Sequence, residues 1–229
     1  MSTCPINGFS NKVLLDFDGV VFRNIGVHSY VANRSSKWLA EHSKTNTKSA
    51  SIQSEYVYRK KGHTSLYDGF NVEALSSYNE YVFDDNIRDI VALSVSAQDK
   101  DRIENFLTIK KNRNLEYILC TNAPSMFCEI VLNSLGYDIT EFFDFTDHYM
   151  LTSDKLKDIK PQASFFEKSE SALSCLFDSP MDHLHFIDDS PMNVNSANAR
   201  GWHAALAFDD TFNYRYLNEF RIDKRSYKH

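Results

Sequence analysis

The sequence has little glycine, proline or cysteine: 7, 5 and 4 residues, respectively, among 229. Such low glycine and proline contents exclude a collagen-like repeat and a low-complexity chain. An apolar content of 42% excludes an intrinsically disordered protein, because so many apolar side chains can form a buried core. At this length we expect one large domain, or a core that carries a smaller inserted module.

No apolar run in the sequence approaches the roughly 20 residues that a membrane-spanning helix requires. The N-terminal residues lack the basic stretch and apolar core of a secretory signal. The four cysteines form neither CxxC pairs nor the spacing of a disulfide framework, which favours reduced thiols in a reducing compartment. We therefore expect a soluble, cytoplasmic protein that has no membrane partner.

Positive charge is also in deficit, since 25 Lys and Arg stand against 31 Asp and Glu, a formal net charge of −6. This balance argues against a nucleic-acid polymer as partner, because such binding needs a basic face that displaces counterions from phosphates. A small phosphorylated metabolite remains compatible with the charge, because a few local cations or a metal ion can bind its phosphate. The sequence leaves open whether the protein is a monomer or a homodimer.

Short apolar runs separated by helical patterns indicate the fold class. Four runs are typical of buried parallel strands: Lys12–Phe17, Leu115–Cys120, His183–Ile187 and Trp202–Phe208. Three helical patterns have proline in their first turn, at Pro124, Pro161 and Pro191. This alternation predicts an α/β fold with a doubly wound, Rossmann-like parallel sheet.

Residues 23–94 have a different character. They are rich in Tyr, Ser and Lys, and apolar residues recur at helical spacing around Tyr30 and Tyr78. We therefore expect a mainly helical domain at 23–94, inserted into a catalytic core formed by residues 1–22 and 95–229.

The first strand run leads into two carboxylates, Asp16 and Asp18. In doubly wound sheets the site lies beyond the carboxyl ends of the strands, where these residues fall. Asp16 is ionised at neutral pH and can attack phosphorus without a base, and Asp18 can protonate the leaving alkoxide and then activate water. Such a pair taken alone is also common as surface acids or as a helix cap.

Three other strand-to-helix junctions carry residues suited to the same chemistry. Thr121 and Asn122 offer a hydroxyl and an amide beside a helix start that can cradle a phosphate, although both residues are also ordinary helix caps. Lys160 can place a point charge on the phosphoryl group, or lie in a solvated basic loop. Asp188 and Asp189 repel each other, which favours a Mg²⁺ ion shared with Asp16 over a surface turn.

The four junctions together identify the sequence as similar to the haloacid dehalogenase (HAD) superfamily. DFDGV, LCTNA, KPQASFFE and FIDDSPMN resemble its four motifs, and the resemblance covers about residues 11–22 and 100–210. It implies that Asp16 is the nucleophile, that Asp18 is the general acid/base, and that Thr121, Asn122 and Lys160 bind the phosphoryl group. It also implies a Mg²⁺ site formed by Asp16, the backbone carbonyl of Asp18, Asp188 and Asp189. Which of Asp188 and Asp189 is the direct ligand stays open.

The resemblance further implies that the insertion at 23–94 is a helical cap that closes over a small phosphorylated metabolite. A narrower similarity is to the pyrimidine 5′-nucleotidase group. It is carried by EYVYRKKGHTSLYDGF and ALSSYNEYVFDDNI in the cap, the least specific part, and by CTNAPSMFCEIVLNSLGY and HFIDDSPMNVNSANARGW in the core. The first motif departs from that group's usual form, which has Asn-Thr after it. The similarity implies a nucleoside 5′-monophosphate as substrate. Candidates for leaving-group recognition in the cap, each equally compatible with a packed or solvated position, are Tyr56, Tyr58, Arg59, Lys60 and His63.

Other activities of the same fold stay open. Dehalogenases of the family lack the acid two positions after the nucleophile, so Asp18 favours phosphate ester hydrolysis. A phosphomutase would return the phosphoryl group to a second substrate hydroxyl, and a phosphonate hydrolase would need a cap lysine, for which Lys60 and Lys61 are candidates. The remaining alternative is a catalytically silent binding or regulatory protein.

Overall fold

The computed structural model describes residues 11–43, 72–144, 149–174, 184–207 and 214–217. Its centre is a five-stranded sheet in the order β3-β2-β1-β4-β5, in which each neighbouring pair is parallel. The strands are β1 (Lys12–Leu15), β2 (Glu116–Thr121), β3 (Leu151–Thr152), β4 (His185–Asp188) and β5 (His203–Leu206). The direction of the strand order reverses at β1, which lies between β2 and β4, so a crevice for a ligand is expected at the carboxyl end of β1.

Nine helices with named bounds accompany the sheet within the described ranges. The helices α1 (Ile25–Ser43), α3 (Val72–Val82) and α4 (Asn86–Ser94) lie between β1 and α5 in the chain. The others are α5 (Ala97–Arg113), α6 (Ser125–Leu135), α7 (Ile139–Phe142), α8 (Ser153–Leu156), α9 (Ala163–Leu173) and α10 (Pro191–Ala199). None of the helices in the described residues combines the length and apolar character needed to cross a bilayer.

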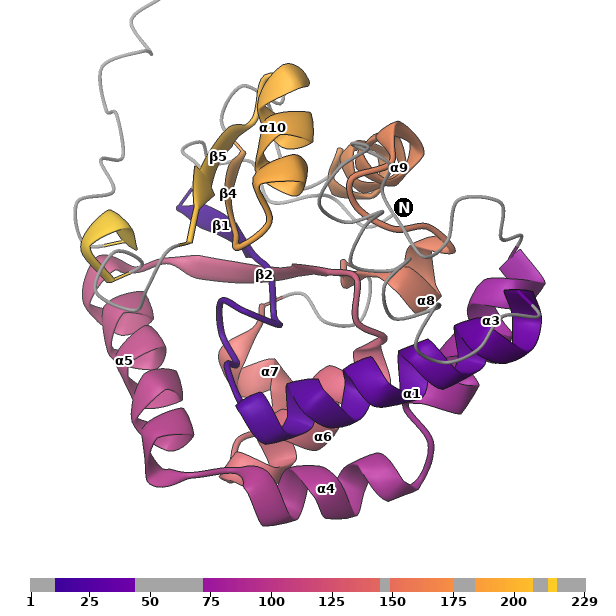
Figure 1. The fold of residues 1–229 in the computed structure, drawn as a ribbon. Coiled ribbons are helices and arrows are strands. Elements are labelled where there is room, and N and C mark those ends of the chain that lie inside the picture. The colour runs from indigo at the N-terminus through magenta and orange to yellow at the C-terminus, as the bar shows by residue number, and fades with distance from the viewer. Residues whose placement is uncertain (1–10, 44–71, 145–148, 175–183, 208–213, 218–229) are drawn as a thin grey trace, which may run out of the picture.

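The sheet is covered on both faces, as Figure 1 shows, with α9 and α10 on one side and α6 and α7 on the other. Alternate side chains of a strand point to opposite faces. Val13 and Leu15 therefore belong to one apolar cluster, whereas Leu14 belongs to a second cluster with Phe165 and Phe166 of α9. The doubly wound α/β fold expected from the sequence is confirmed.

Most of the predicted helix boundaries follow from local signals. α6 begins after Pro124 and ends at Gly136, whose φ of 90° needs a residue without a Cβ. α10 begins at Pro191, as predicted. The pattern after Lys160 was expected to start a helix at Pro161, but α9 starts two residues later, at Ala163.

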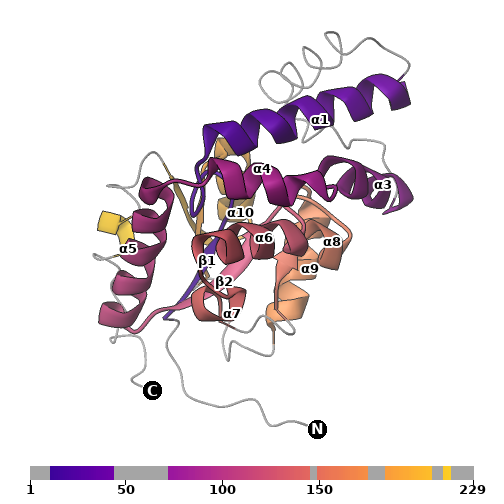
Figure 2. The same ribbon diagram turned by 90° about the horizontal axis from the view of Figure 1, so that it is seen from below.

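The helices that precede α5 pack as a group, and Figure 2 shows α1, α3 and α4 side by side. Arg34 of α1 forms an ion pair of 2.7 Å with Asp84, and the hydroxyl of Tyr30 donates to the same carboxylate at 2.9 Å. The Ser35 and Tyr78 hydroxyls lie 2.7 Å apart. These contacts connect α1 to α3 and to the turn that precedes α4.

The chain enters the group formed by α1, α3 and α4 after β1 and leaves it before α5. The entry and exit points lie next to each other. Asn24 accepts hydrogen bonds from the backbone N–H groups of Gly26 and Val27 at the start of α1. Its amide nitrogen donates to the Ser94 carbonyl at 2.7 Å and to the Asp99 carboxylate at 3.1 Å. One side chain thus fixes the entry and the exit of the inserted segment against each other.

Candidate active site

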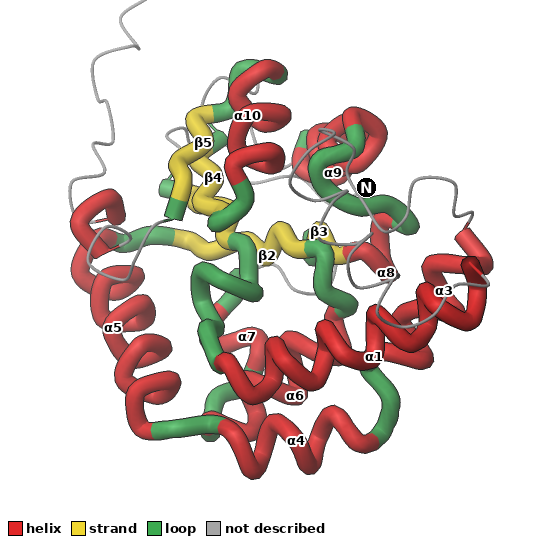
Figure 3. Tube along the Cα trace, in the orientation of Figure 1, coloured by secondary structure: helices red, strands yellow, loops and turns green. Residues whose placement is uncertain are grey.

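Four segments that are distant in sequence bring their polar residues together at the carboxyl edge of the sheet. Asp16 follows β1, Thr121 ends β2 and Asp188 ends β4. Figure 3 shows these strands passing into loops at this edge. Lys160 reaches the same point, where its Nζ lies 3.1 Å from Asp16 Oδ1 and 2.5 Å from Asp188 Oδ2. The structure therefore brings together four of the residues that the sequence selected.

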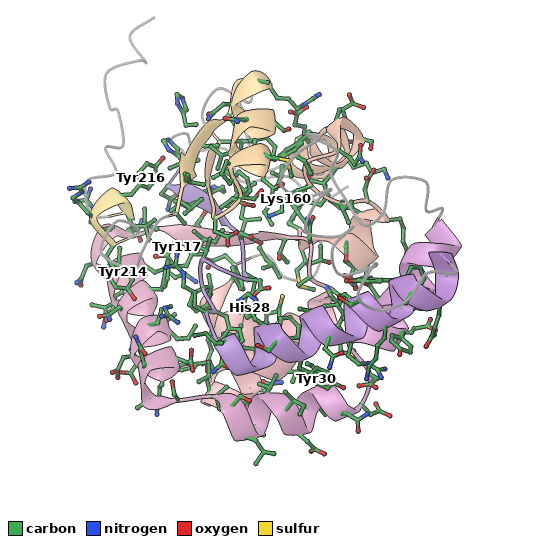
Figure 4. The ribbon with its side chains drawn as sticks, viewed as in Figure 1. His28, Tyr30, Tyr117, Lys160, Tyr214 and Tyr216 are labelled. Carbon is green, nitrogen blue, oxygen red and sulfur yellow. The ribbon has the colours of Figure 1, made fainter. Side chains whose placement is uncertain are left out.

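Lys160 is held as a buried cation, and its side chain is labelled in Figure 4. Besides the two carboxylates, its ammonium group donates to the Cys120 carbonyl at 2.8 Å. Burial alone would lower the pKa of Lys160, but Asp16 and Asp188 more than offset this and hold the pKa above its usual range. The lysine therefore stays charged between the two carboxylates.

Asp188 is fully buried, and both of its carboxylate oxygens accept hydrogen bonds. Oδ2 accepts from Lys160, and Oδ1 accepts from the backbone N–H of Ser190 at 2.8 Å. The amide nitrogen of Asn193 donates to both oxygens, at 2.9 and 3.0 Å. Asn193 lies in the FIDDSPMN segment but was not among the residues selected from the sequence. Its place in the first turn of α10, after two acids, was the available signal.

Asp16, Asp188 and Asp189 form a cluster in which one carboxylate oxygen from each lies within 4.8 Å of the others. Asp16 and Asp188 are buried, and Asp189 is exposed. Burial raises the pKa of Asp16; Lys160 opposes this, Asp188 and Asp189 add to it, and a hydrogen bond from Thr121 opposes it. Three converging carboxylate groups fit a hard divalent cation such as Mg²⁺, which takes oxygen ligands.

A tight turn after Asp16 brings the backbone against Asp189. Gly19 has a φ of +85°, and a Cβ at this residue would lie 2.1 Å from Asp189 Oδ2. The Gly19 N–H donates to the Phe22 carbonyl at 2.8 Å, and Arg23 Nε donates to the Gly19 carbonyl. Glycine is therefore required at residue 19 both for its backbone conformation and for the space that Asp189 occupies.

The carboxylate of Asp18 pairs with a residue from the inserted helices. His28 Nε2 of α1 lies 3.0 Å from Asp18 Oδ1, and the Asp18 side chain is 40% exposed. Protein on the other sides of Asp18 desolvates it and raises its pKa to about 6; His28 and Lys160 lower the pKa, and Asp189 raises it. His28, which is labelled in Figure 4, was not selected from the sequence, because nothing distinguishes it there from a solvated helix residue.

Thr121 and Asn122 are held next to this cluster. The Thr121 hydroxyl hydrogen-bonds to the Asp16 carboxylate and accepts from the Ala123 N–H at 3.2 Å. The side chain of Asn122 makes two bonds with the backbone of Lys160: its Oδ1 accepts from the N–H at 2.6 Å, and its Nδ2 donates to the carbonyl at 3.0 Å. Asn122 therefore positions the Lys160 segment beside β2.

The sequence analysis also selected residues that lie outside the described residues. They are the candidates for leaving-group recognition or Schiff-base chemistry in the cap, namely Tyr56, Tyr58, Arg59, Lys60, Lys61 and His63.

Comparison with known proteins yields likenesses of structure. No protein-family model matches the chain, and no curated protein matches it. A HAD phosphatase from Thermococcus onnurineus is similar in structure, with a TM-score of 0.52 and 17% identity over 86% of each chain. CbbY from Rhodobacter sphaeroides in complex with phosphate matches with a TM-score of 0.50 and 14% identity, over 95% of this chain and 92% of CbbY. At these identities the likeness shows the fold alone, a parallel sheet covered by helices on both faces.

Proposed function

We propose that the protein is a Mg²⁺-dependent phosphatase that hydrolyses a small phosphate monoester through an aspartyl-phosphate intermediate. The observation that carries this proposal is the meeting of Asp16, Lys160, Asp188 and Asp189 at the carboxyl edge of β1 and β4. The likeness in fold to a HAD phosphatase and to CbbY in complex with phosphate also supports it.

Asp16 is the nucleophile in this mechanism. Its Oδ1 accepts a hydrogen bond from the Phe17 N–H at 2.8 Å and forms an ion pair with Lys160. These two contacts hold the carboxylate in place. A carboxylate oxygen of Asp16 forms a bond to phosphorus while the bond from phosphorus to the alkoxide oxygen breaks. The neighbouring ammonium group of Lys160 stabilises the charge on the phosphoryl oxygens in the transition state.

Asp18 moves the proton in both halves of the reaction. Its carboxyl group is open to solvent on one side, as a group that meets a leaving alkoxide must be. In the first half, protonated Asp18 gives its proton to the departing oxygen. In the second half, ionised Asp18 accepts a proton from the water that attacks the aspartyl-phosphate, and inorganic phosphate and Asp16 are released.

The two adjacent acids after β4 take different roles in our proposal. Asp188 uses its oxygens on Lys160, Ser190 and Asn193, so it orients the lysine. Asp189 is exposed beside Asp16, so these two, with the backbone carbonyl of Asp18, hold the metal. When bound, Mg²⁺ supplies positive charge that neutralises the phosphoryl oxygens and keeps Asp16 ionised.

We infer a nucleoside 5′-monophosphate as the substrate, on the similarity of the core and cap segments quoted above to the pyrimidine 5′-nucleotidase group. In the same proposal residues 23–94, which include α1, α3 and α4, act as the cap domain of a cytoplasmic enzyme. Release of inorganic phosphate from p-nitrophenyl phosphate, with and without Mg²⁺, tests the reaction, and a panel of nucleoside monophosphates and sugar phosphates tests the substrate. Metal-dependent release supports the phosphatase, and its absence with all of these esters contradicts it.

A further inference from the structure

A groove lies between the inserted helices and the sheet edge. It is lined by residues other than the cluster of Asp16, Lys160, Asp188 and Asp189. Three elements line it: α3, the loop and first turn at the start of α6, and α8. Its principal lining residues are Asn79, Glu80, Pro124, Met126, Ser153 and Lys157. The groove has a volume of about 180 Å³, which exceeds the roughly 150 Å³ that admits one benzene ring in an engineered cavity. It can therefore hold one five- or six-membered ring.

The groove begins close to the proposed phosphoryl site. Thr121, whose hydroxyl binds Asp16, is paired with Thr152 across β2 and β3, and Ser153 is the next residue. Neighbouring strands lie about 4.8 Å apart and consecutive Cα atoms about 3.8 Å apart, so Ser153 lies one strand spacing and one residue step from Thr121. Pro124 lies three residues after Thr121 on the same side of the sheet edge. A group attached to a phosphate on Asp16 can reach the groove.

The polar lining of the groove suits hydroxyl groups. The amide nitrogen of Asn79 donates to the Ser153 hydroxyl at 3.4 Å, a long bond that a ligand hydroxyl can replace with a shorter one. Glu80 offers an exposed carboxylate as an acceptor. Pro124 and Met126, which is 43% exposed, offer an apolar surface to the face of a ring.

The charge of the groove does not suit a second phosphate. Glu80 and Asp154 contribute two carboxylates, against the one ammonium group of Lys157. The Asp154 carboxylate accepts from the N–H of Ser125 at 2.9 Å and from its hydroxyl at 2.7 Å, which holds that carboxylate in the lining. An anionic group entering here would meet a net negative surface.

We propose that this groove binds the leaving group of the substrate, and that the leaving group is a neutral, hydroxyl-bearing ring such as a pentose. The assignment rests on the proposed phosphatase activity and narrows its substrate to monoesters without a second phosphate. Asn79 donates to one of the hydroxyls, and Glu80 accepts from another and excludes an anion.

The test compares three probes in the presence of Mg²⁺: ribose 5-phosphate, ribulose 1,5-bisphosphate and p-nitrophenyl phosphate, which carries no sugar hydroxyls. The wild-type protein is expected to prefer ribose 5-phosphate to both others in kcat/KM. In Asn79→Leu, the ratio of kcat/KM for ribose 5-phosphate to that for p-nitrophenyl phosphate falls about tenfold, chiefly through KM, because a hydrogen-bonding group is lost. In Glu80→Gln, the preference for the monophosphate over the bisphosphate falls about fivefold.

Asn133→Leu is the matched control, because Asn133 is exposed on α6 and does not line the groove. It leaves both ratios unchanged, and circular dichroism confirms that each variant is folded. Two results would overturn the groove assignment while the phosphatase proposal stands, provided that p-nitrophenyl phosphate is hydrolysed. One is that both kcat/KM ratios are unchanged in Asn79→Leu and Glu80→Gln. The other is that the wild-type protein shows no preference for ribose 5-phosphate. Failure of the wild-type protein to hydrolyse any probe would overturn both.

Discussion

The ammonium nitrogen of Lys160 lies 2.5 Å from Oδ2 of Asp188, although the two residues are 28 positions apart in the chain. Both side chains are excluded from solvent. The pair therefore serves the fold as well as the site: it joins the segment before α9 to the end of β4 and aims the lysine at Asp16. Substitutions at Asp188 and at its neighbour Asp189 should separate the role in the fold from the role in the site.

Asp188→Asn should destabilise the protein by about 3 kcal/mol, because it removes one of the two charges that compensate the buried Lys160. Asp189→Asn should leave the free energy of unfolding in the absence of metal unchanged or raised, because it relieves repulsion among the three carboxylates. Its affinity for Mg²⁺ should instead fall about tenfold or more. Urea unfolding and calorimetric titration with Mg²⁺ measure the two quantities. Equal loss of stability in the two variants would contradict the separate roles.

Gly19→Ala should weaken Mg²⁺ binding, because the new Cβ would lie 2.1 Å from Asp189 Oδ2 and force that carboxylate away. Gly201→Ala is a matched control: its φ of +89° carries a similar backbone cost, but a Cβ there meets nothing within 4 Å. Both variants should lose about 1–2 kcal/mol of stability from the left-handed backbone. Only Gly19→Ala should change the metal affinity measured by titration calorimetry, and a normal affinity in it would refute the contact.

His28→Leu should lower kcat about 10- to 100-fold with little change in KM, because Asp18 loses the partner that orients its carboxylate. His28→Gln, whose amide can donate in place of Nε2, should recover part of the rate. Steady-state kinetics with an alkyl phosphate, a substrate that needs protonation of its leaving group, reveals the effect most clearly. A change confined to KM would show that His28 contacts substrate and does not position Asp18.

An ion pair far from the site predicts a pH dependence of stability. Glu170 accepts from Arg200 Nε at 2.7 Å, from Arg200 Nη2 at 2.6 Å and from the indole of Trp202 at 3.1 Å. The Arg200 bonds are the largest cause that holds the pKa of Glu170 below its ordinary value of 4.5. A lowered pKa stabilises the fold above pH 4.5, and the contribution is lost as the pH falls through the pKa of the folded protein.

Glu170→Gln should therefore be less stable than the wild-type protein by about 1 kcal/mol at pH 7. The difference should stay constant down to about pH 5.5 and shrink below pH 4.5. Urea unfolding of both proteins across this range measures it. A difference that grows on acidification would have the wrong sign for a carboxylate with a lowered pKa.

The sequence predicted the parts of the site that follow directly from strand ends. Asp16, Thr121 and Asp188 were found because each terminates an apolar run, and parallel strands bring such ends to one edge. β3 escaped prediction because Leu151–Thr152 is too short to show a period. His28 escaped because its role depends on how α1 lies over the sheet.

Contacts that depend on tertiary packing could not be predicted from the sequence either. Asn122 was expected to face a phosphate, but its amide binds the backbone of Lys160 at 2.6 and 3.0 Å, a partner 38 residues away. Asn193 gave no signal beyond its place in the first turn of a helix. A motif supplies the chemical groups of a site, whereas the side chains that hold them depend on which elements pack together.

The central claim is that Asp16 takes the phosphoryl group onto its side chain. In Asp18→Asn with p-nitrophenyl phosphate and Mg²⁺, the good leaving group needs no proton, so the intermediate should form, while its hydrolysis lacks a base and is slow. Mass spectrometry of the acid-quenched, digested protein should then find one phosphoryl group on the peptide that contains Asp16, and none in the Asp16→Asn, Asp18→Asn double variant. Turnover without phosphorylation of Asp16, or the same adduct in the double variant, would contradict the account.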